Sequence, residues 1–216
     1  MGKNINNYVK LKEMKKIIFT LVIFLVALFQ FAPIARAATD TIALSTAVQT
    51  SLALSLSSNV YAFGNLIAGT PLMGSAGIDI DVTTNASNGY TLGISDGVAG
   101  TDSALLHTDG VTRIADASAL IAAPALWVSG TTKGMGVTVY AADTSKEGKW
   151  GTGATYDSAD NKYAGVPTGA TTIHTSAAYK TGADTTSISF IVDVPADQKA
   201  GTYSGNETIT ATAVLL

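Results

Sequence analysis

The sequence predicts an all-β fold, arranged as an antiparallel β-sandwich, for most of the chain. Two observations support this expectation: short segments that alternate apolar and polar residues, and a body rich in Ala, Gly, Ser and Thr. Period-two alternation is typical of half-buried strands, and several such segments between turn residues indicate an antiparallel sandwich or barrel, of which we expect the sandwich. None of the 216 residues is a cysteine. Without disulfides, such a domain depends on its hydrophobic core for stability.

The first expected element is a secretory signal peptide over residues 1–37. A basic stretch, 10–16, precedes an apolar run, 17–29, and the small-x-small triplet Ala35-Arg36-Ala37 follows. This three-part layout predicts export and cleavage after Ala37. The alternative is an uncleaved membrane anchor, because 17–35 is nearly long enough to span a bilayer. Contact with a membrane is expected only through an uncleaved leader.

Residues 38–216 are expected to form a single domain. Removing residues 1–37 takes away six of the 13 basic and one of the 16 acidic residues, which leaves 179 residues with a net charge of −8. An acidic chain repels phosphates, so nucleic-acid binding is excluded. This length is sufficient to bury a core without cross-links.

Strand-like segments follow one another along this domain. In the terminal segment, the odd-numbered positions are mostly small or apolar and the even-numbered positions are mostly Thr, which predicts one buried face. The other segments with this alternation are TIALSTAV (41–48), SLALSLSS (51–58), GVTVYAA (136–142) and TTSISFIVDV (185–194), ahead of the terminal 202–216.

The stretch IDIDVTTNASNGYTLGIS, 78–95, predicts a β-hairpin. Two alternating runs flank 85–89, which is rich in residues that tolerate positive φ. Asp79 and Asp81 lie two residues apart and therefore share the outward face. We interpret them as a solvated strand face, with a paired-carboxylate site as the alternative.

Two segments depart from the strand pattern. The Ala-rich stretch from Asp116 to Ala122 predicts a short helical segment that Pro124 stops. Residues 143–172 are expected to form a long loop, and long loops are common contact sites. Its aromatic residues Trp150, Tyr156 and Tyr163 are the candidate ligand-binding residues. Two interpretations of Trp150 remain open: an exposed ring for a sugar or a protein, or a ring that closes the loop against the sandwich.

No motif predicts catalysis, a metal site or a cofactor. A formal G-x-S-x-G match surrounds Ser95, but glycines follow it where a nucleophile elbow requires a helix. His107 and His174 are isolated, and two histidines do not make a zinc site. The Asp-rich turns 143–148 and 157–161 lack EF-hand spacing and are interpreted as hydrated turns, with a weak calcium site as the alternative. We therefore expect a protein that is not an enzyme.

Three stretches together resemble a set of bacterial secreted surface proteins. They are LALSLSSNVYAFGNLIAGTP, TTNASNGYTLGIS and ISFIVDVPADQKAGTYSGNETITATAVL. The last is similar to the end of WxL-type cell-wall-associated domains and of fibre subunits, although Trp-Val-Ser stands at Trp127 in place of Trp-x-Leu. The resemblance implies an immunoglobulin-like or Greek-key sandwich, a location at the cell surface and attachment to the cell wall.

These observations favour a non-catalytic structural or adhesive surface protein. Its small-residue segments 41–58 and 202–216 are expected to pair with a second copy or with other surface proteins, because an open sheet edge offers unpaired backbone groups. The alternative is a module that binds cell-wall glycan through Trp150, Tyr156 and Tyr163. A hydrolase that uses Ser95 ranks far behind both.

Overall fold

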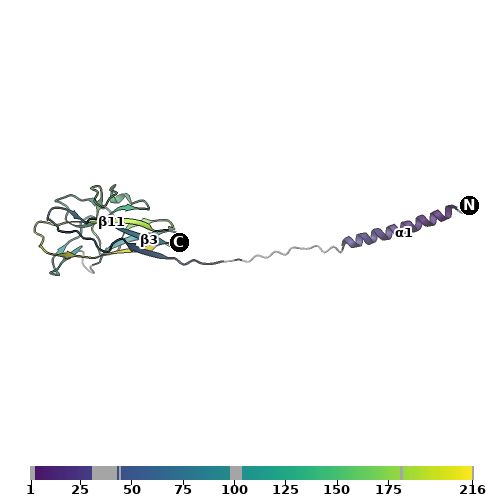
Figure 1. Ribbon diagram of the computed structural model, residues 1–216, viewed down its shortest axis with the longest axis horizontal. Helices are drawn as coiled ribbons and strands as arrows, with labels where there is room; N and C mark the ends of the chain where they lie inside the picture. The colour runs from purple at the N-terminus through teal and green to yellow at the C-terminus, as the bar shows by residue number, and fades with distance from the viewer. Residues whose placement is uncertain (1–2, 31–42, 44, 98–103, 181, 216) are drawn as a thin grey trace. The chain divides into compact units, whose positions relative to one another are not determined.

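The structure, a computed structural model, describes residues 3–30, 43, 45–97, 104–180 and 182–215. The chain divides into two compact units, Met1–Ala47 and Val48–Leu216. The first unit contains the helix α1 (Lys3–Gln30), which includes the apolar run 17–29 (Figure 1). No helix in the described part of the chain is long and apolar enough to cross a membrane. The expected cleavage position, Ala37, lies outside the described residues.

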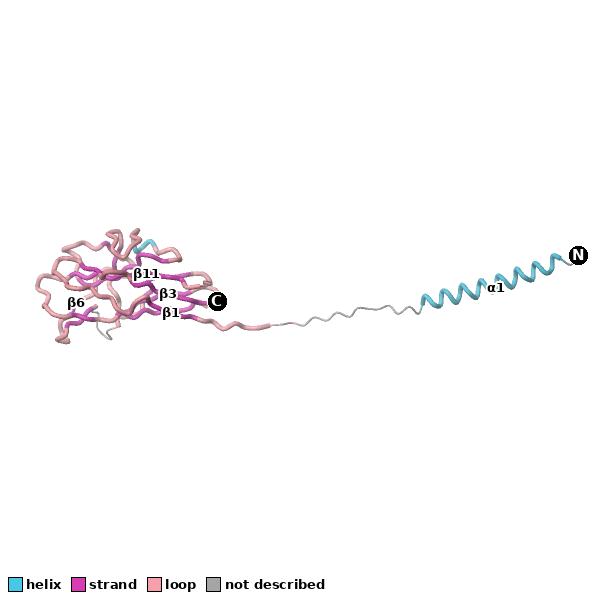
Figure 2. The backbone as a smooth tube through the Cα atoms, in the orientation of Figure 1, coloured by secondary structure: helices cyan, strands magenta, loops and turns pink. Residues whose placement is uncertain are grey.

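The regular secondary structure of the second unit is mostly antiparallel strands, as the sequence predicts. Its largest sheet has the order β1-β3-β11-β2, with β8 also paired to β11; Figure 2 shows β1, β3 and β11 side by side. A second sheet has the order β10-β4-β13. The strands of the largest sheet are β1 (Leu52–Leu56), β2 (Leu72–Met73), β3 (Ile78–Thr84), β8 (Gly134–Ala142) and β11 (Asp184–Asp193), and those of the second are β4 (Tyr90–Asp96), β10 (Thr171–Ser176) and β13 (Glu207–Ala213).

Shorter elements complete the second unit. A three-stranded sheet has the order β12-β5-β6, and β7 pairs with β9. A single 3₁₀ turn, η1, lies in the loop after β8. The bounds are β5 (Leu105–His107), β6 (Arg113–Ile114), β7 (Ala125–Leu126), η1 (Gly148–Trp150), β9 (Lys162–Tyr163) and β12 (Tyr203–Ser204).

The core forms where the apolar rows of the two larger sheets meet. In β3 the side chains of Ile80 and Val82 are fully buried, and in β4 those of Leu92 and Ile94 are fully buried. All four belong to one hydrophobic cluster, which also includes residues of β8 and β11. The strands expected at 136–142 and 185–194 are therefore confirmed. Their near-continuous burial shows that β8 and β11 lie at the centre of the fold.

The predicted hairpin of 78–95 is wrong. Both strands exist, but β3 pairs with β1 and β11, whereas β4 pairs with β10 and β13 in the other sheet. The connection 85–89 therefore carries the chain from one sheet to the other. Gly89 makes this possible: its φ is +72°, and a Cβ there would lie 1.9 Å from the carbonyl oxygen of Ser176.

The helix expected from Asp116 to Ala122 is also absent. The backbone N–H of Ala117 donates to Met135 of β8, and the N–H of Gly165 donates to Ala119. The Asp116 carboxylate accepts from the N–H of Val166. Backbone groups that a helix would pair internally are thus paired with distant segments, because Ala117 and Ile121 are drawn into the core.

Of the first two expected strands, the described residues contain one. β1 lies within 51–58, as predicted. The described residues of 41–48 form no strand. The terminal segment forms β13, in which the odd-numbered residues are half-buried and the even-numbered residues are exposed. The face predicted for this segment is therefore confirmed.

Candidate interaction surface

The edge strands β1 and β13 lie next to each other, with Cα atoms within 8 Å, yet they belong to different sheets. In the described part of the chain, β1 pairs only with β3, and β13 pairs only with β4. Each strand therefore has one free edge. We call this pair of free edges the seam.

The apolar side chains of both strands at the seam point toward the core but are incompletely covered. Leu54 is the cross-strand neighbour of the buried Val82, so the two side chains share a face. Leu52, Leu54 and Leu56 nevertheless keep 38%, 37% and 38% of their surface exposed. In β13, Ile209 lies opposite the buried Ile94 and remains half-buried. The core thus reaches solvent along this side of the unit.

The backbone of β1 presents unpaired groups at the seam. The N–H of Ser57 donates to Asp79, and Ser51 accepts from the N–H of Asn85. In an antiparallel pair these bonds recur at every second residue, so the odd-numbered residues of β1 bond to β3. The N–H and C=O groups of Leu52, Leu54 and Leu56 therefore point away from β3.

The backbone of β13 follows the same rule. The N–H of Gly97 donates to Asn206, and the N–H of Val214 donates to Gly89. Even-numbered residues of β13 therefore bond to β4, and the backbone groups of Ile209, Ala211 and Ala213 point away from it.

Other segments of the chain bond to the other long edges of the two sheets. On the outer side of β8, Val137 pairs with Ala164, and Met135 with Asp116. On β10, the indole N–H of Trp150 donates to the carbonyl of Ile173 at 2.9 Å. Natural sheets protect exposed edges with charges, prolines or bulges, yet 51–58 and 208–215 contain no charged residue and no proline. The seam is therefore the one pair of long, unprotected edges among the described strands.

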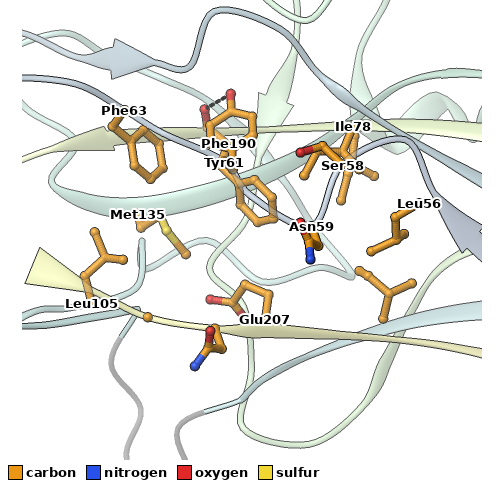
Figure 3. A pocket seen from close by; sticks show the side chains of 14 residues that line it. Leu56, Ser58, Asn59, Tyr61, Phe63, Ile78, Leu105, Met135, Phe190 and Glu207 are labelled. Atoms are coloured by element: carbon orange, nitrogen blue, oxygen red, sulfur yellow. Dashed lines mark hydrogen bonds between the residues drawn. The ribbon is translucent and has the colours of Figure 1, made fainter.

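A cavity of 160 Å³ opens beside the seam (Figure 3). It is lined by apolar and aromatic side chains from both larger sheets and from the segment after β1. Figure 3 shows the Glu207 side chain pointing into it from β13, on the side opposite Tyr61 and Phe190. The other lining residues are Leu56, Ser58, Asn59, Phe63, Ile78, Leu105, Met135, Ile188, Gly205, Asn206 and Ile209.

Glu207 is the unusual group of this cavity. Both carboxyl oxygens are buried, and no described residue donates a hydrogen bond to them. Burial, together with the nearby carboxylates of Asp96 and Asp116, raises the pKa of Glu207 to about 9. The described residues contain no group of three His, Asp or Glu side chains that could hold a metal ion. The cavity therefore presents a carboxyl group that is neutral at pH 7 when unbound.

The three predicted ligand-binding residues are largely withdrawn from solvent. Trp150 is fully buried, Tyr163 keeps 4% of its surface exposed, and Tyr156 is half-buried. Of the two interpretations of Trp150, the structure has the second: the ring closes the 143–172 loop against β10. Trp127 is half-buried and packs edge-on against Tyr163, with ring centroids 5.9 Å apart.

Ser95 of the formal G-x-S-x-G match and the two histidines lie in three different strands. Ser95 is within β4, opposite Thr208, and not at a turn into a helix. His174 lies opposite Leu92, so its ring is on the buried face of the same sheet, and burial lowers its pKa. His107 is in β5, where its ring packs against Tyr203. No nucleophile–base pair forms among these residues.

A second, larger hollow of 670 Å³ lies between the segments 61–68 and 198–205. Tyr61, Phe63 and Tyr203 contribute aromatic surface to it, and Gln198 and Asn65 contribute amide groups. The phenol of Tyr203 accepts a hydrogen bond from Gln198 and donates one to the carbonyl of Lys199. Its ring is thereby held in place.

Comparison of the chain with models of known protein families, with curated proteins and with solved structures finds no match. The seam and the two cavities therefore carry the functional argument by themselves.

Proposed function

We propose that this protein is a secreted, non-catalytic bacterial surface protein that associates with copies of itself through the seam. In this proposal the two larger sheets form a β-sandwich of immunoglobulin-like or Greek-key type, and the leader is cleaved after Ala37. The observation that carries the proposal is the pair of unprotected edges, β1 and β13, on one side of the domain.

A second copy of the chain is the partner that fits the seam. The exposed strand β1 offers backbone donors and acceptors at Leu52, Leu54 and Leu56, and a strand from another molecule can pair with them. Its side chains would also cover the leucine row, which is more than a third exposed. Every copy carries the same edges. β1 contains no charged residue, and the one acidic residue of β13, Glu207, points inward and would not face an identical strand.

The proposal predicts concentration-dependent association. Protein purified from cells that express the full chain is studied by sedimentation velocity over a range of concentrations, and labelled cells are studied by electron microscopy. The expected result is a shift to larger species with concentration and labelled assemblies at the cell surface. A monomer at every concentration, together with cells that carry no assemblies, would contradict self-association. Mass spectrometry of the exported product, expected to begin at Ala38, tests the leader separately.

Binding of cell-wall glycan is the second candidate function, and the larger hollow is the feature that favours it. Aromatic rings beside amide and hydroxyl groups suit a sugar ring, which has apolar faces and polar edges. In a peptidoglycan pulldown, Phe63→Ala is expected to reduce retention and Tyr179→Ala, at an exposed position elsewhere, is not. Equal retention of both variants and of the unmodified protein would exclude this candidate.

A further inference from the structure

The cavity beside the seam holds a carboxyl group whose hydrogen-bond partner is not supplied by the described residues. Both oxygens of Glu207 are buried and unpaired. A buried polar group without a partner is costly, since it has lost its bonds to water. Because this group points into an open cavity, a ligand can supply the missing bond.

The charges around Glu207 select the kind of ligand. None of the described residues that line the cavity is basic. Asp96 and Asp116 both disfavour a negative charge on Glu207. A positively charged ligand would relieve this repulsion, whereas an anion would increase it.

The walls of the cavity suit a cation at the end of an alkyl chain. Tyr61 packs edge-on against Phe63 and Phe190, with centroids 5.1 and 5.2 Å away, so three aromatic rings lie together there. Aromatic rings attract cations. Leu105 and Met135 add apolar surface for the alkyl part.

Neutral acceptors are also available. Asn59 and Asn206 line the cavity, and each amide oxygen can accept a hydrogen bond. An ammonium group has three donors, so Glu207 and these amides together can pair all of them. The 160 Å³ of the cavity is far more than the roughly 15 Å³ that one water molecule needs.

We propose that this cavity binds a primary alkylammonium group, with Glu207 as its counter-ion. The ligand chemistry is that of a free aliphatic amine or of a lysine side chain. The site does not depend on self-association, because all the residues that form it belong to one molecule.

The test is an NMR titration of the protein, labelled at its methionine methyl groups, with n-butylammonium at mildly alkaline pH. The signal of Met135 is expected to shift and to saturate. n-Butanol, the uncharged analogue, is expected to bind at least about ten-fold more weakly, since a charged hydrogen bond is lost. Nα-acetyl-lysine methylamide, added in a parallel arm, distinguishes the sources: comparable affinity identifies a lysine side chain, and no affinity identifies a small free amine.

Glu207→Gln keeps the shape of the side chain and removes its charge. It is expected to weaken n-butylammonium binding at least about ten-fold and to leave n-butanol binding unchanged. Glu207→Asp keeps the carboxyl group but shortens the side chain by one methylene, and it is expected to give an intermediate affinity. The control is Glu147→Gln, at an acidic residue paired with Lys149 outside the cavity, and it is expected to change nothing. Equal affinity for n-butanol, full binding by Glu207→Gln, or no response of Met135 would each overturn the proposal.

Discussion

Leu54 and Val82 are cross-strand neighbours with side chains on the same face, yet Val82 is fully buried and Leu54 keeps 37% of its surface exposed. The difference arises because β3 lies inside its sheet and β1 is its edge. A strand placed on the free edge of β1 would cover Leu54 as β1 covers Val82. The proposed self-association follows from this relationship.

Replacement of Leu54 separates backbone pairing from side-chain contact. Leu54→Ala and Leu54→Pro both remove the leucine, but only proline also removes the N–H that points away from β3. Both variants are expected to fold, since that N–H makes no bond within the ladder with β3. In sedimentation velocity, Leu54→Pro is expected to associate much more weakly than Leu54→Ala. Equal association of the two variants would show that strand pairing is not involved.

Trp150 is expected to act in stability and not in binding. Trp150→Ala removes a fully buried ring and leaves the carbonyl of Ile173 without its donor, so the loss in free energy of unfolding is expected to be about 3–5 kcal/mol. Tyr179→Ala, at an exposed ring, should change stability by less than about 0.5 kcal/mol. Urea unfolding measures both, and similar small losses would contradict the buried position of Trp150.

Glu207 is expected to make the stability of the protein depend on pH. Its pKa is raised from 4.5 to about 9 by burial and by Asp96 and Asp116, so the folded chain keeps a proton that the unfolded chain has lost. Folding therefore takes up a proton between these values, and stability falls as the pH rises through this window. In urea unfolding across the window, Glu207→Gln should flatten the decline. An unchanged slope would show that Glu207 is not the responsible group.

Asp184 is expected to make the protein less stable as the pH falls, which is the opposite of the effect of Glu207. Burial alone raises its pKa, but hydrogen bonds from Ser176, Thr144, Tyr90 and Lys180 together lower it below its ordinary value of 3.8. Its contribution is present above that value and is lost as the pH falls through the lowered pKa. Asp184→Asn is expected to cost about 2–3 kcal/mol at neutral pH and progressively less in acid. A cost that does not change with pH would contradict an ionised Asp184.

Gly89 and Gly110 allow backbone strain to be separated from steric overlap. Both have positive φ, +72° and +75°, but a Cβ on Gly89 would overlap the backbone of Ser176, whereas a Cβ on Gly110 meets nothing within 4 Å. Gly110→Ala is expected to cost about 1 kcal/mol from conformation alone. Gly89→Ala is expected to cost clearly more in the same unfolding experiment. If the two variants lose the same free energy of unfolding, the connection between β3 and β4 does not lie as close to Ser176 as described.

The sequence predicts strands well where side-chain alternation and burial coincide. In β13, Ile209 and Ala211 face the core because the period of a strand is two, which is a local property. The partner of a strand is not local. The alternation of apolar and polar residues in 78–95 would be the same whether its two strands paired as a hairpin or belonged to different sheets. The second neighbour of β3 is β11, about a hundred residues later in the chain.

In the candidate sites, too, local features could be predicted from the sequence and contacts between distant segments could not. The free edges of β1 and β13 could be anticipated, because 51–58 and 208–215 contain no charged residue. The burial of Trp150 could be offered only as one of two interpretations, because it depends on Ile173 of a strand 23 residues later. Glu207 left a signal that the sequence interpretation did not use: it is the charged residue at an inward position of the terminal strand. The cavity around it is formed by residues from distant segments and has no local pattern.

Amide hydrogen exchange at single residues tests self-association through β1 most directly. The N–H of Leu54 points to the free edge, whereas that of Ser55 belongs to the ladder with β3. If copies pair through the seam, Leu54 exchanges quickly in dilute protein and becomes protected as the concentration rises, while Ser55 stays protected throughout. If the protein associates and Leu54 still exchanges as quickly as in dilute solution, the seam is not the interface.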